Sequence, residues 1–119
     1  MSQYRISNAA RTDIVDILRS SQLQFGGAAR HRYQALILTA LQEIAALPQR
    51  IGTAGRDDIA PGLRSYHLTH SRQSARQSRA YVKKPRHIVF YRVLTGDVIE
   101  VVRLLHDAMD VQLHFPEEQ

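Results

Sequence analysis

The chain changes its hydrophobic period along its length, and these changes divide it into helical and extended parts. Tyr4 to Ile6 is a short β-prone stretch, after which Ser7 and Asn8 supply the side chains of a helix N-cap. Apolar residues then recur at helical spacing up to Phe25-Gly26-Gly27, where glycine favours the end of a helix. One face of this predicted helix holds Ala10, Ile14, Ile17, Leu18 and Ser21.

A second, longer helix is predicted after Gly27, because a broad apolar stripe continues until Pro48 stops it. The stripe consists of Ala29, Tyr33, Leu36, Ile37, Ala40, Leu41, Ile44 and Leu47. Two amphipathic helices separated by a tight Gly-Gly turn predict an antiparallel helical hairpin. Both stripes need a common apolar partner, which strands further along the chain can supply.

The segment from Arg86 to His106 predicts a β-hairpin, because two β-rich runs flank a three-residue loop that contains glycine. With Thr95-Gly96-Asp97 as the loop, Leu94 faces Val98. The further predicted pairs are Arg92 with Glu100, Phe90 with Val102, and Ile88 with Leu104. One opposite-charge pair and two apolar pairs favour this register over a slip by one residue.

The rest of the chain has a less regular pattern. Residues 49–62 form a turn-rich connector, and Leu63 to Leu68 is a predicted strand. The Ser/Gln/Arg-rich segment from Thr69 to about Tyr81 lacks apolar periodicity, so we expect a long mobile loop. In the tail we expect His114-Phe115 to dock and Pro116 to Gln119 to fray.

The predicted order β-α-α-β-β-β gives an α+β fold, in which an N-terminal strand and an α-helical hairpin pack in two layers on an antiparallel sheet. With 119 residues, the chain (1–119) is expected to form a single domain with one core. Both faces of the predicted β-hairpin are apolar. One face would rest on the helices, and the other must be covered by the tail, a partner or a second copy.

Composition excludes several classes of protein. The chain has no cysteine, which excludes disulfides and thiolate metal sites and suits a reducing cytoplasm. The N-terminus lacks the apolar core of a signal peptide, and the longest uncharged helical run, Tyr33 to Gln42, is too short to span a membrane. His67 and His70 would point to opposite faces of a strand, so we expect no shared metal site and no cofactor. These features predict a soluble cytoplasmic protein that does not enter a membrane.

The net charge of +5 is concentrated in one block, because no acidic residue occurs between Asp58 and Asp97. Such a block favours association with a polyanion or an acidic partner. The alternative is a solvated loop that only aids solubility, since Tyr81 is the one aromatic residue among the loop's charges. The cations of the block are Arg64, Arg72, Arg76, Arg79, Lys83, Lys84, Arg86 and Arg92.

Short motifs spread over nearly the whole chain resemble those of toxins of the RelE/ParE superfamily, and of its ParE branch in particular. The two most specific motifs are His87–Val93 and Val101–Asp110, because few β-hairpins end in such a sequence. The chain departs from its relatives in a basic loop insertion at about residues 69–85, where they have a short turn. The other motifs are Tyr4–Ile14, Gly26-Gly27, Ile44–Pro48 and Ile59–Ser65.

The resemblance implies the toxin component of a type II toxin–antitoxin system, of the kind associated with plasmid stabilisation and growth arrest. A cognate antitoxin from a neighbouring gene would bind the toxin in a hetero-oligomer and neutralise it. ParE-type toxins are generally associated with inhibiting DNA gyrase and blocking replication, whereas the RelE ribonucleases of similar fold cut mRNA on the ribosome. The resemblance therefore favours a gyrase poison that acts by binding, and the ribosome is the alternative target.

A metal-independent mRNA endoribonuclease would need a base, an acid and cations for the phosphate. Against this reading, the Lys-rich segment that precedes the equivalent arginine in RelE is replaced here by Gly55–Asp58. A histidine at a strand end, such as His106, is more often a packed or capped residue than a catalyst, and Arg103 is explained at least as well as an ion-pair partner of Asp107 or Asp110. The residues that the resemblance offers for catalysis are Arg64, His67, Arg103 and His106.

If the toxin acts by binding, charge and shape matter more than an acid–base pair. The antitoxin is expected to be acidic, with a C-terminal segment that is disordered alone and orders over the exposed sheet face and the groove beside the helical hairpin. A third possibility is an inactive relative that retains only antitoxin binding. The residues predicted for target binding are Arg64, Arg72, Arg76, Lys83, Lys84, Arg103, His106 and Asp110.

Overall fold

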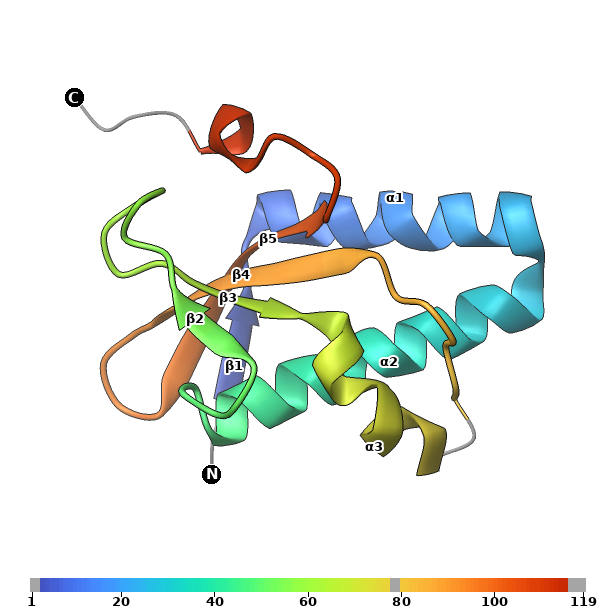
Figure 1. Cartoon of the computed structure of the whole chain (residues 1–119), viewed down its shortest axis with the longest axis horizontal. Helices are drawn as coiled ribbons and strands as arrows, with labels where there is room; N and C mark the ends of the chain where they lie inside the picture. Colours follow the sequence, from blue (N-terminus) through green and yellow to red (C-terminus); the bar gives the residue numbers. More distant parts are fainter. Residues whose placement is uncertain (1–2, 78–79, 116–119) are drawn as a thin grey trace.

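The computed structural model describes residues 3–77 and 80–115 and confirms the predicted two-layer α+β class. Its strands form one sheet in the order β1-β5-β4-β3-β2 (Figure 1). β1 runs parallel to β5, and the other neighbours are antiparallel. With η for a 3₁₀ turn, the elements are β1 (Gln3–Ile6), α1 (Asn8–Phe25), α2 (Gly27–Ala46), β2 (Thr53–Gly55), β3 (Arg64–His67), η1 (Leu68–Ser71), α3 (Arg72–Gln77), β4 (His87–Val93), β5 (Val98–His106) and η2 (Val111–His114).

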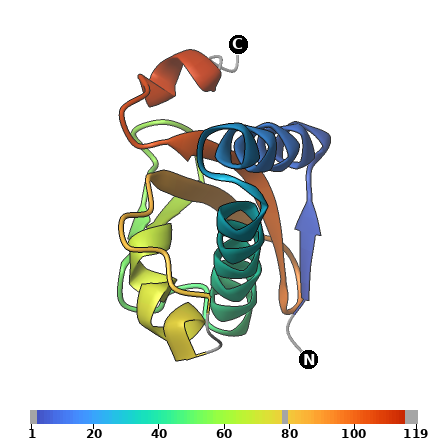
Figure 2. The same ribbon diagram turned by 90° about the vertical axis from the view of Figure 1, so that its right-hand side faces the viewer.

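Local sequence features set the bounds of the two long helices, as predicted. Ser7 Oγ accepts a hydrogen bond from the Ala10 backbone N–H at 3.0 Å and so caps α1. Gly26 has a φ of 94°, which few residues with a side chain adopt, so glycine ends α1 and turns the chain into α2. The two helices pack on each other and cover one face of the sheet (Figure 2). Neither these helices nor any other in the described part of the chain is long and apolar enough to cross a membrane.

The sheet separates a large apolar cluster from a small one. The large cluster, between the helices and the sheet, includes the fully buried side chains of Leu36, Ile44, Tyr66, Tyr91 and Val101. The small cluster forms around Leu63, Phe90 and Leu105 on the other face. There Phe115 packs with its ring centre 5.3 Å from that of Phe90. The predicted docking of the tail is therefore confirmed for Phe115, and the tail covers part of the second sheet face.

The predicted hairpin register is confirmed near the turn, where Arg92 pairs with Glu100. Further from the turn the prediction is wrong, because a β-bulge next to Phe90 inserts one extra residue into β5. The bulge places Leu104 in the large cluster with Val101, which a regular alternation would not allow. The observed pairs are Phe90 with Arg103 and Ile88 with Leu105, instead of Val102 and Leu104.

The predicted mobile loop after β3 is wrong in its first part, which forms η1 and α3. Leu68, Ser71 and Ala75 are fully buried, and their helical spacing is obscured in the sequence by the polar residues between them. Ser74 donates a hydrogen bond at 3.1 Å to Glu43, which ties α3 to α2. The predicted connector also contains β2, a short edge strand that pairs with β3. Residues 78–79, with the Arg79 of the basic block, and the tail residues 116–119 lie outside the described residues.

Candidate functional site

A cluster of titratable side chains forms where β3 ends, β4 begins and β5 ends. Asp107 lies at its centre and accepts a hydrogen bond from His67 Nε2 at 2.9 Å. Arg86 Nη2 lies 2.9 Å from the same carboxylate, and His106 Nδ1 lies 3.6 Å from it. The hydrogen bond from His67, supported by Arg86, lowers the pKa of Asp107 and keeps it ionised. The cluster is thus organised around one carboxylate, which pairs with Arg86 and accepts a hydrogen bond from His67.

A second set of contacts continues from this cluster to α2. Tyr33 Oη lies 2.6 Å from His87 Nδ1 and accepts a hydrogen bond from the Arg86 backbone N–H at 3.2 Å. Tyr33 thus links the start of β4 to α2 through both a side chain and a backbone group. The rings of His87 and His106 meet edge to face, with centres 5.3 Å apart. Burial raises the pKa of Tyr33 to about 12 and lowers that of His87 to about 4, so both are neutral at pH 7.

These side chains form part of the lining of a groove of about 670 Å³, here called the basic groove, between the helical hairpin and the segment before β4. Its cationic lining residues are Arg32, Lys83, Lys84 and Arg86. Its aromatic lining residues are Phe25, Tyr33 and Tyr81. No carboxylate is among the described residues that line it. Cations and aromatic rings without a carboxylate suit an anionic ligand with flat groups.

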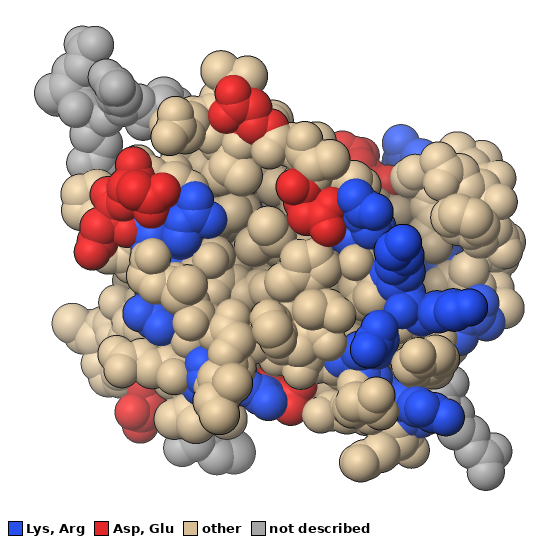
Figure 3. Space-filling view, viewed as in Figure 1, with Lys and Arg blue, Asp and Glu red and all other residues tan. Residues whose placement is uncertain are grey.

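The basic groove continues into a band of cations over α3. The Arg76 guanidinium lies 5.0 Å from the ring centre of Tyr81, and Arg72 Nη1 donates to the Lys83 backbone carbonyl at 2.9 Å. Figure 3 shows this band of Lys and Arg side chains over α3 and the segment that leads to β4. The structure therefore brings together five of the residues predicted for target binding, namely Arg72, Arg76, Lys83, Lys84 and His106.

Arg64 lies at the opposite end of β3 from His67, away from the basic groove. Its Nη2 donates to Thr53 Oγ1 at 2.9 Å and its Nε to the Pro48 carbonyl at 3.2 Å. These contacts join β3 to the β2 edge and to the end of α2. In this structure Arg64 therefore acts as a link between elements.

Arg103 pairs with Asp13 of α1, at 2.8 Å between Nε and Oδ2 and 2.9 Å between Nη2 and Oδ1. The suggested partners Asp107 and Asp110 are thus wrong, because the register shift at the bulge turns Arg103 towards α1. Asp110 instead accepts a hydrogen bond from the Gln112 backbone N–H at 3.3 Å and caps η2.

Of the four residues offered for a nuclease, the structure brings together only His67 and His106, on either side of Asp107. Both ring nitrogens of His67 are occupied, because Nδ1 accepts from the Thr69 backbone N–H at 3.0 Å while Nε2 donates to Asp107. His67 therefore holds the carboxylate in place and has no nitrogen left for a substrate proton. Within residues 3–77 and 80–115, no group of His, Asp and Glu side chains is arranged to hold a metal ion.

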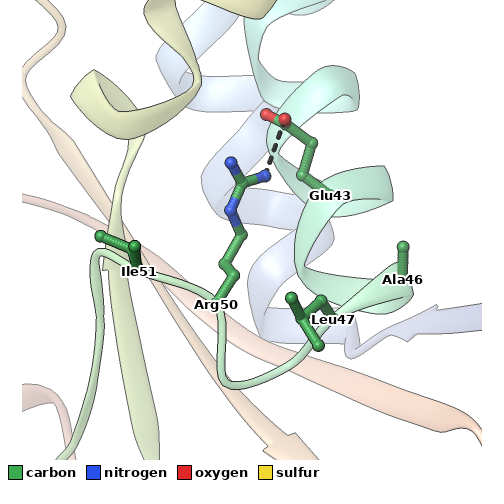
Figure 4. A pocket seen from close by; sticks show the side chains of 5 residues that line it. All are labelled: Glu43, Ala46, Leu47, Arg50 and Ile51. Carbon is green, nitrogen blue, oxygen red and sulfur yellow. Dashed lines mark ion pairs between the residues drawn. The ribbon is translucent and has the colours of Figure 1, made fainter.

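Two further hollows lie elsewhere on the surface. One, of about 700 Å³ on the outer sheet face, is lined by Arg92, Arg103 and Phe115 among others. The other, of about 430 Å³, lies at the C-terminal end of α2. Figure 4 shows its Glu43–Arg50 ion pair, which is 2.7 Å long. These hollows are separate from the Asp107 cluster.

Four residues of the site were not among those predicted from the sequence: Tyr33, Arg86, His87 and Asp107. Tyr33 belonged to the predicted apolar stripe and His87 to the motif His87–Val93, and neither context indicates that the two side chains contact each other. Arg86 was counted only as part of the basic block, and Asp107 only as a suggested partner of Arg103. The contacts that join them span 54 residues between Tyr33 and His87, so only the folded chain shows them.

Comparisons with known proteins agree with this fold. Residues 4–111 match the family described as ParE toxin of type II toxin–antitoxin system, parDE. Toxin ParE1 of Mycobacterium tuberculosis, from strains CDC 1551 / Oshkosh and ATCC 25618 / H37Rv, is 32% identical over 110 residues, covering 92% of this chain and 94% of each relative. A solved structure of the chromosomal ParDE TA system from P. aeruginosa has a TM-score of 0.52 and 18% identity, over 89% of this chain and 95% of that one.

Proposed function

Since the chain belongs to the family of ParE toxins of type II toxin–antitoxin systems, we propose that it binds DNA gyrase in the cytoplasm and blocks replication. The observation that supports binding over catalysis is the arrangement around Asp107. Its carboxylate already engages His67 and Arg86, and Arg64 and Arg103 are engaged at other places. The remaining free chemistry is the charge and the aromatic surface of the basic groove, which suits recognition of a partner.

We further propose that a cognate antitoxin neutralises the toxin through an acidic segment that orders on binding. The basic groove lies beside the helical hairpin and has no carboxylate in its described lining, so it attracts acidic side chains. The outer sheet face offers a separate, partly apolar surface around Val102 and Phe115.

The test of the target is a supercoiling and cleavage-complex assay with purified gyrase, run beside a ribosome-dependent mRNA cleavage assay. The proposal predicts inhibited supercoiling or trapped DNA breaks, with the mRNA intact. Cut mRNA with normal supercoiling would contradict it and would assign the RelE-like activity. No effect in both assays, together with normal growth when the toxin is expressed without an antitoxin, would identify an inactive relative that only binds an antitoxin.

The role of the cations can be measured from association rates. The variant Lys83→Glu/Lys84→Glu should slow association with gyrase or antitoxin and weaken its dependence on salt, because long-range attraction mainly affects the on-rate. The matched control is Arg11→Glu/Arg19→Glu, which changes the charge equally at two exposed positions of α1 outside the groove lining. Equal on-rates for wild type and the Lys83/Lys84 variant at low salt would count against a role for the basic groove.

A further inference from the structure

The basic groove combines exposed aromatic rings with cations, and attraction of an acidic partner alone does not account for the rings. Phe25, at the C-terminal end of α1, is 74% exposed, and Tyr81, in the segment before β4, is 36% exposed. Binding is favoured when a ligand removes large apolar rings from water. Their position in the lining of a cationic groove therefore points to a ligand with both negative charge and flat apolar faces.

We propose that the basic groove binds a single strand of DNA, with phosphates at Arg32, Lys83 and Lys84 and unstacked bases on Phe25 and Tyr81. Grooves that bind single strands elsewhere combine these same two elements, a cationic path for the backbone and aromatic rings for the bases. The inference rests on the proposed function in its choice of DNA, because gyrase acts on DNA.

The cations of the groove are available for phosphates. Within the described residues, the side chains of Arg32, Lys83 and Lys84 take part in no ion pair, whereas Arg86 is paired with Asp107. The groove also presents His106, whose Nδ1 accepts from the Ala108 backbone N–H at 3.1 Å, which leaves the proton on Nε2. His106 Nε2 can thus donate a hydrogen bond to a phosphate or a base edge.

The aromatic lining of the groove favours a single strand over other polyanions. In a duplex the faces of the bases are stacked on each other, so they cannot reach rings that line a groove. A glutamate-rich peptide would satisfy the cations, but its side chains have no flat face for Phe25 and Tyr81. The two predicted contributions, charge and stacking, can be removed separately.

The experiment is fluorescence anisotropy of the full-length toxin with a labelled oligothymidylate of about 12 nucleotides, measured over a range of salt concentrations. Lys83→Gln/Lys84→Gln should weaken binding at low salt and reduce the slope of log K against log salt by about 1.4, because each lost phosphate contact removes about 0.7. Phe25→Ala should weaken binding by about tenfold and leave the slope unchanged. The matched controls are Arg11→Gln/Arg19→Gln for charge and Leu23→Ala for an exposed apolar side chain of α1 outside the groove lining.

Several results would overturn the inference. They are the absence of binding at low salt, an equal loss in the control variants, or an affinity unaffected by Phe25→Ala. Equal binding of a duplex or of polyglutamate would show that the groove recognises only negative charge. Tighter binding of oligouridylate would show that the ligand is RNA instead of DNA. Gyrase inhibition without oligonucleotide binding would contradict this inference and leave the proposed function intact, whereas binding without gyrase inhibition would do the reverse.

Discussion

The ion pair between Asp13 and Arg103 should be one of the larger single contributions to the stability of this fold. Asp13 accepts three hydrogen bonds, from Arg103 Nε at 2.8 Å, from Arg103 Nη2 at 2.9 Å and from the Leu104 backbone N–H at 3.0 Å. The pair joins α1 to β5, which are 90 residues apart in the chain. We therefore predict that Asp13→Ala destabilises the protein while leaving the basic groove unchanged.

The magnitude follows from the geometry and the exposure of the pair. Its side chains are only 13% and 23% exposed, so water replaces the lost hydrogen bonds incompletely. A bidentate, charge-assisted pair of this kind lies between a surface pair and a fully buried one, and its disruption should cost about 2 to 3 kcal/mol. For a domain of this size, that corresponds to a loss of roughly 10 °C in Tm.

The assay is urea and thermal unfolding of wild type, Asp13→Ala, Arg103→Ala and the double variant. The double variant should be more stable than the sum of the single changes predicts, with a coupling energy of about 1.5 kcal/mol. Arg103→Lys should restore only part of the stability, because lysine cannot form the bidentate contact. A coupling energy near zero would refute the pair as a stabilising link and would return Arg103 to the list of surface residues available for a target.

Three further predictions concern other parts of the molecule. The pKa of His87 is about 4 in the folded protein against an ordinary 6.5, so the unfolded chain binds an extra proton between these pH values. The free energy of unfolding should therefore fall by up to about 3 kcal/mol as the pH decreases from 6.5 to 4. His87→Gln should flatten this part of the curve of stability against pH, and identical curves for both proteins would contradict the prediction. Ser7→Ala removes the cap of α1 and the hydrogen bond that Ser7 Oγ donates to the Val102 carbonyl at 2.8 Å. The free energy of unfolding should therefore decrease by about 1 to 2 kcal/mol. A change below about 0.3 kcal/mol would show that water replaces both contacts. Phe115→Ala uncovers part of the outer sheet face, so the free energy of unfolding should decrease by about 1 to 2 kcal/mol. The fluorescence of a dye that binds apolar surface should increase. Unchanged dye binding would mean that the tail does not protect this face.

Much of the fold could be predicted from the sequence because its main features are local. The cap at Ser7, the glycine at the end of α1 and the alternation on both sides of the turn at Gly96 each follow from a few neighbouring residues. The bulge in β5 has no such local feature, since Val102 and Arg103 fit a regular strand equally well. The helical segment 68–77 was not predicted, because its buried residues Ser71 and Ala75 are small and do not form a recognisable apolar stripe.

The candidate site could be predicted only in part. The basic block and the motif Val101–Asp110 are visible in the sequence, and the fold places Lys83, Lys84 and His106 around one groove. The partners of the charged residues were not visible, because a pair such as Asp13 and Arg103 depends on a bulge and on the packing of a distant helix. The same is true of Tyr33 and His87, whose hydrogen bond depends on the packing of α2 against the start of β4.

The most direct test of the account is the amount of gyrase–DNA cleavage complex trapped by three proteins: wild type, Lys83→Glu/Lys84→Glu and the charge-matched control Arg11→Glu/Arg19→Glu. All three should first be shown to have the same Tm, so that differences in folding are excluded. The account predicts that the wild type and the control trap gyrase equally, and that the Lys83/Lys84 variant traps little. Equal trapping by all three, or trapping by none, would contradict the claim that this toxin acts on gyrase through its basic groove.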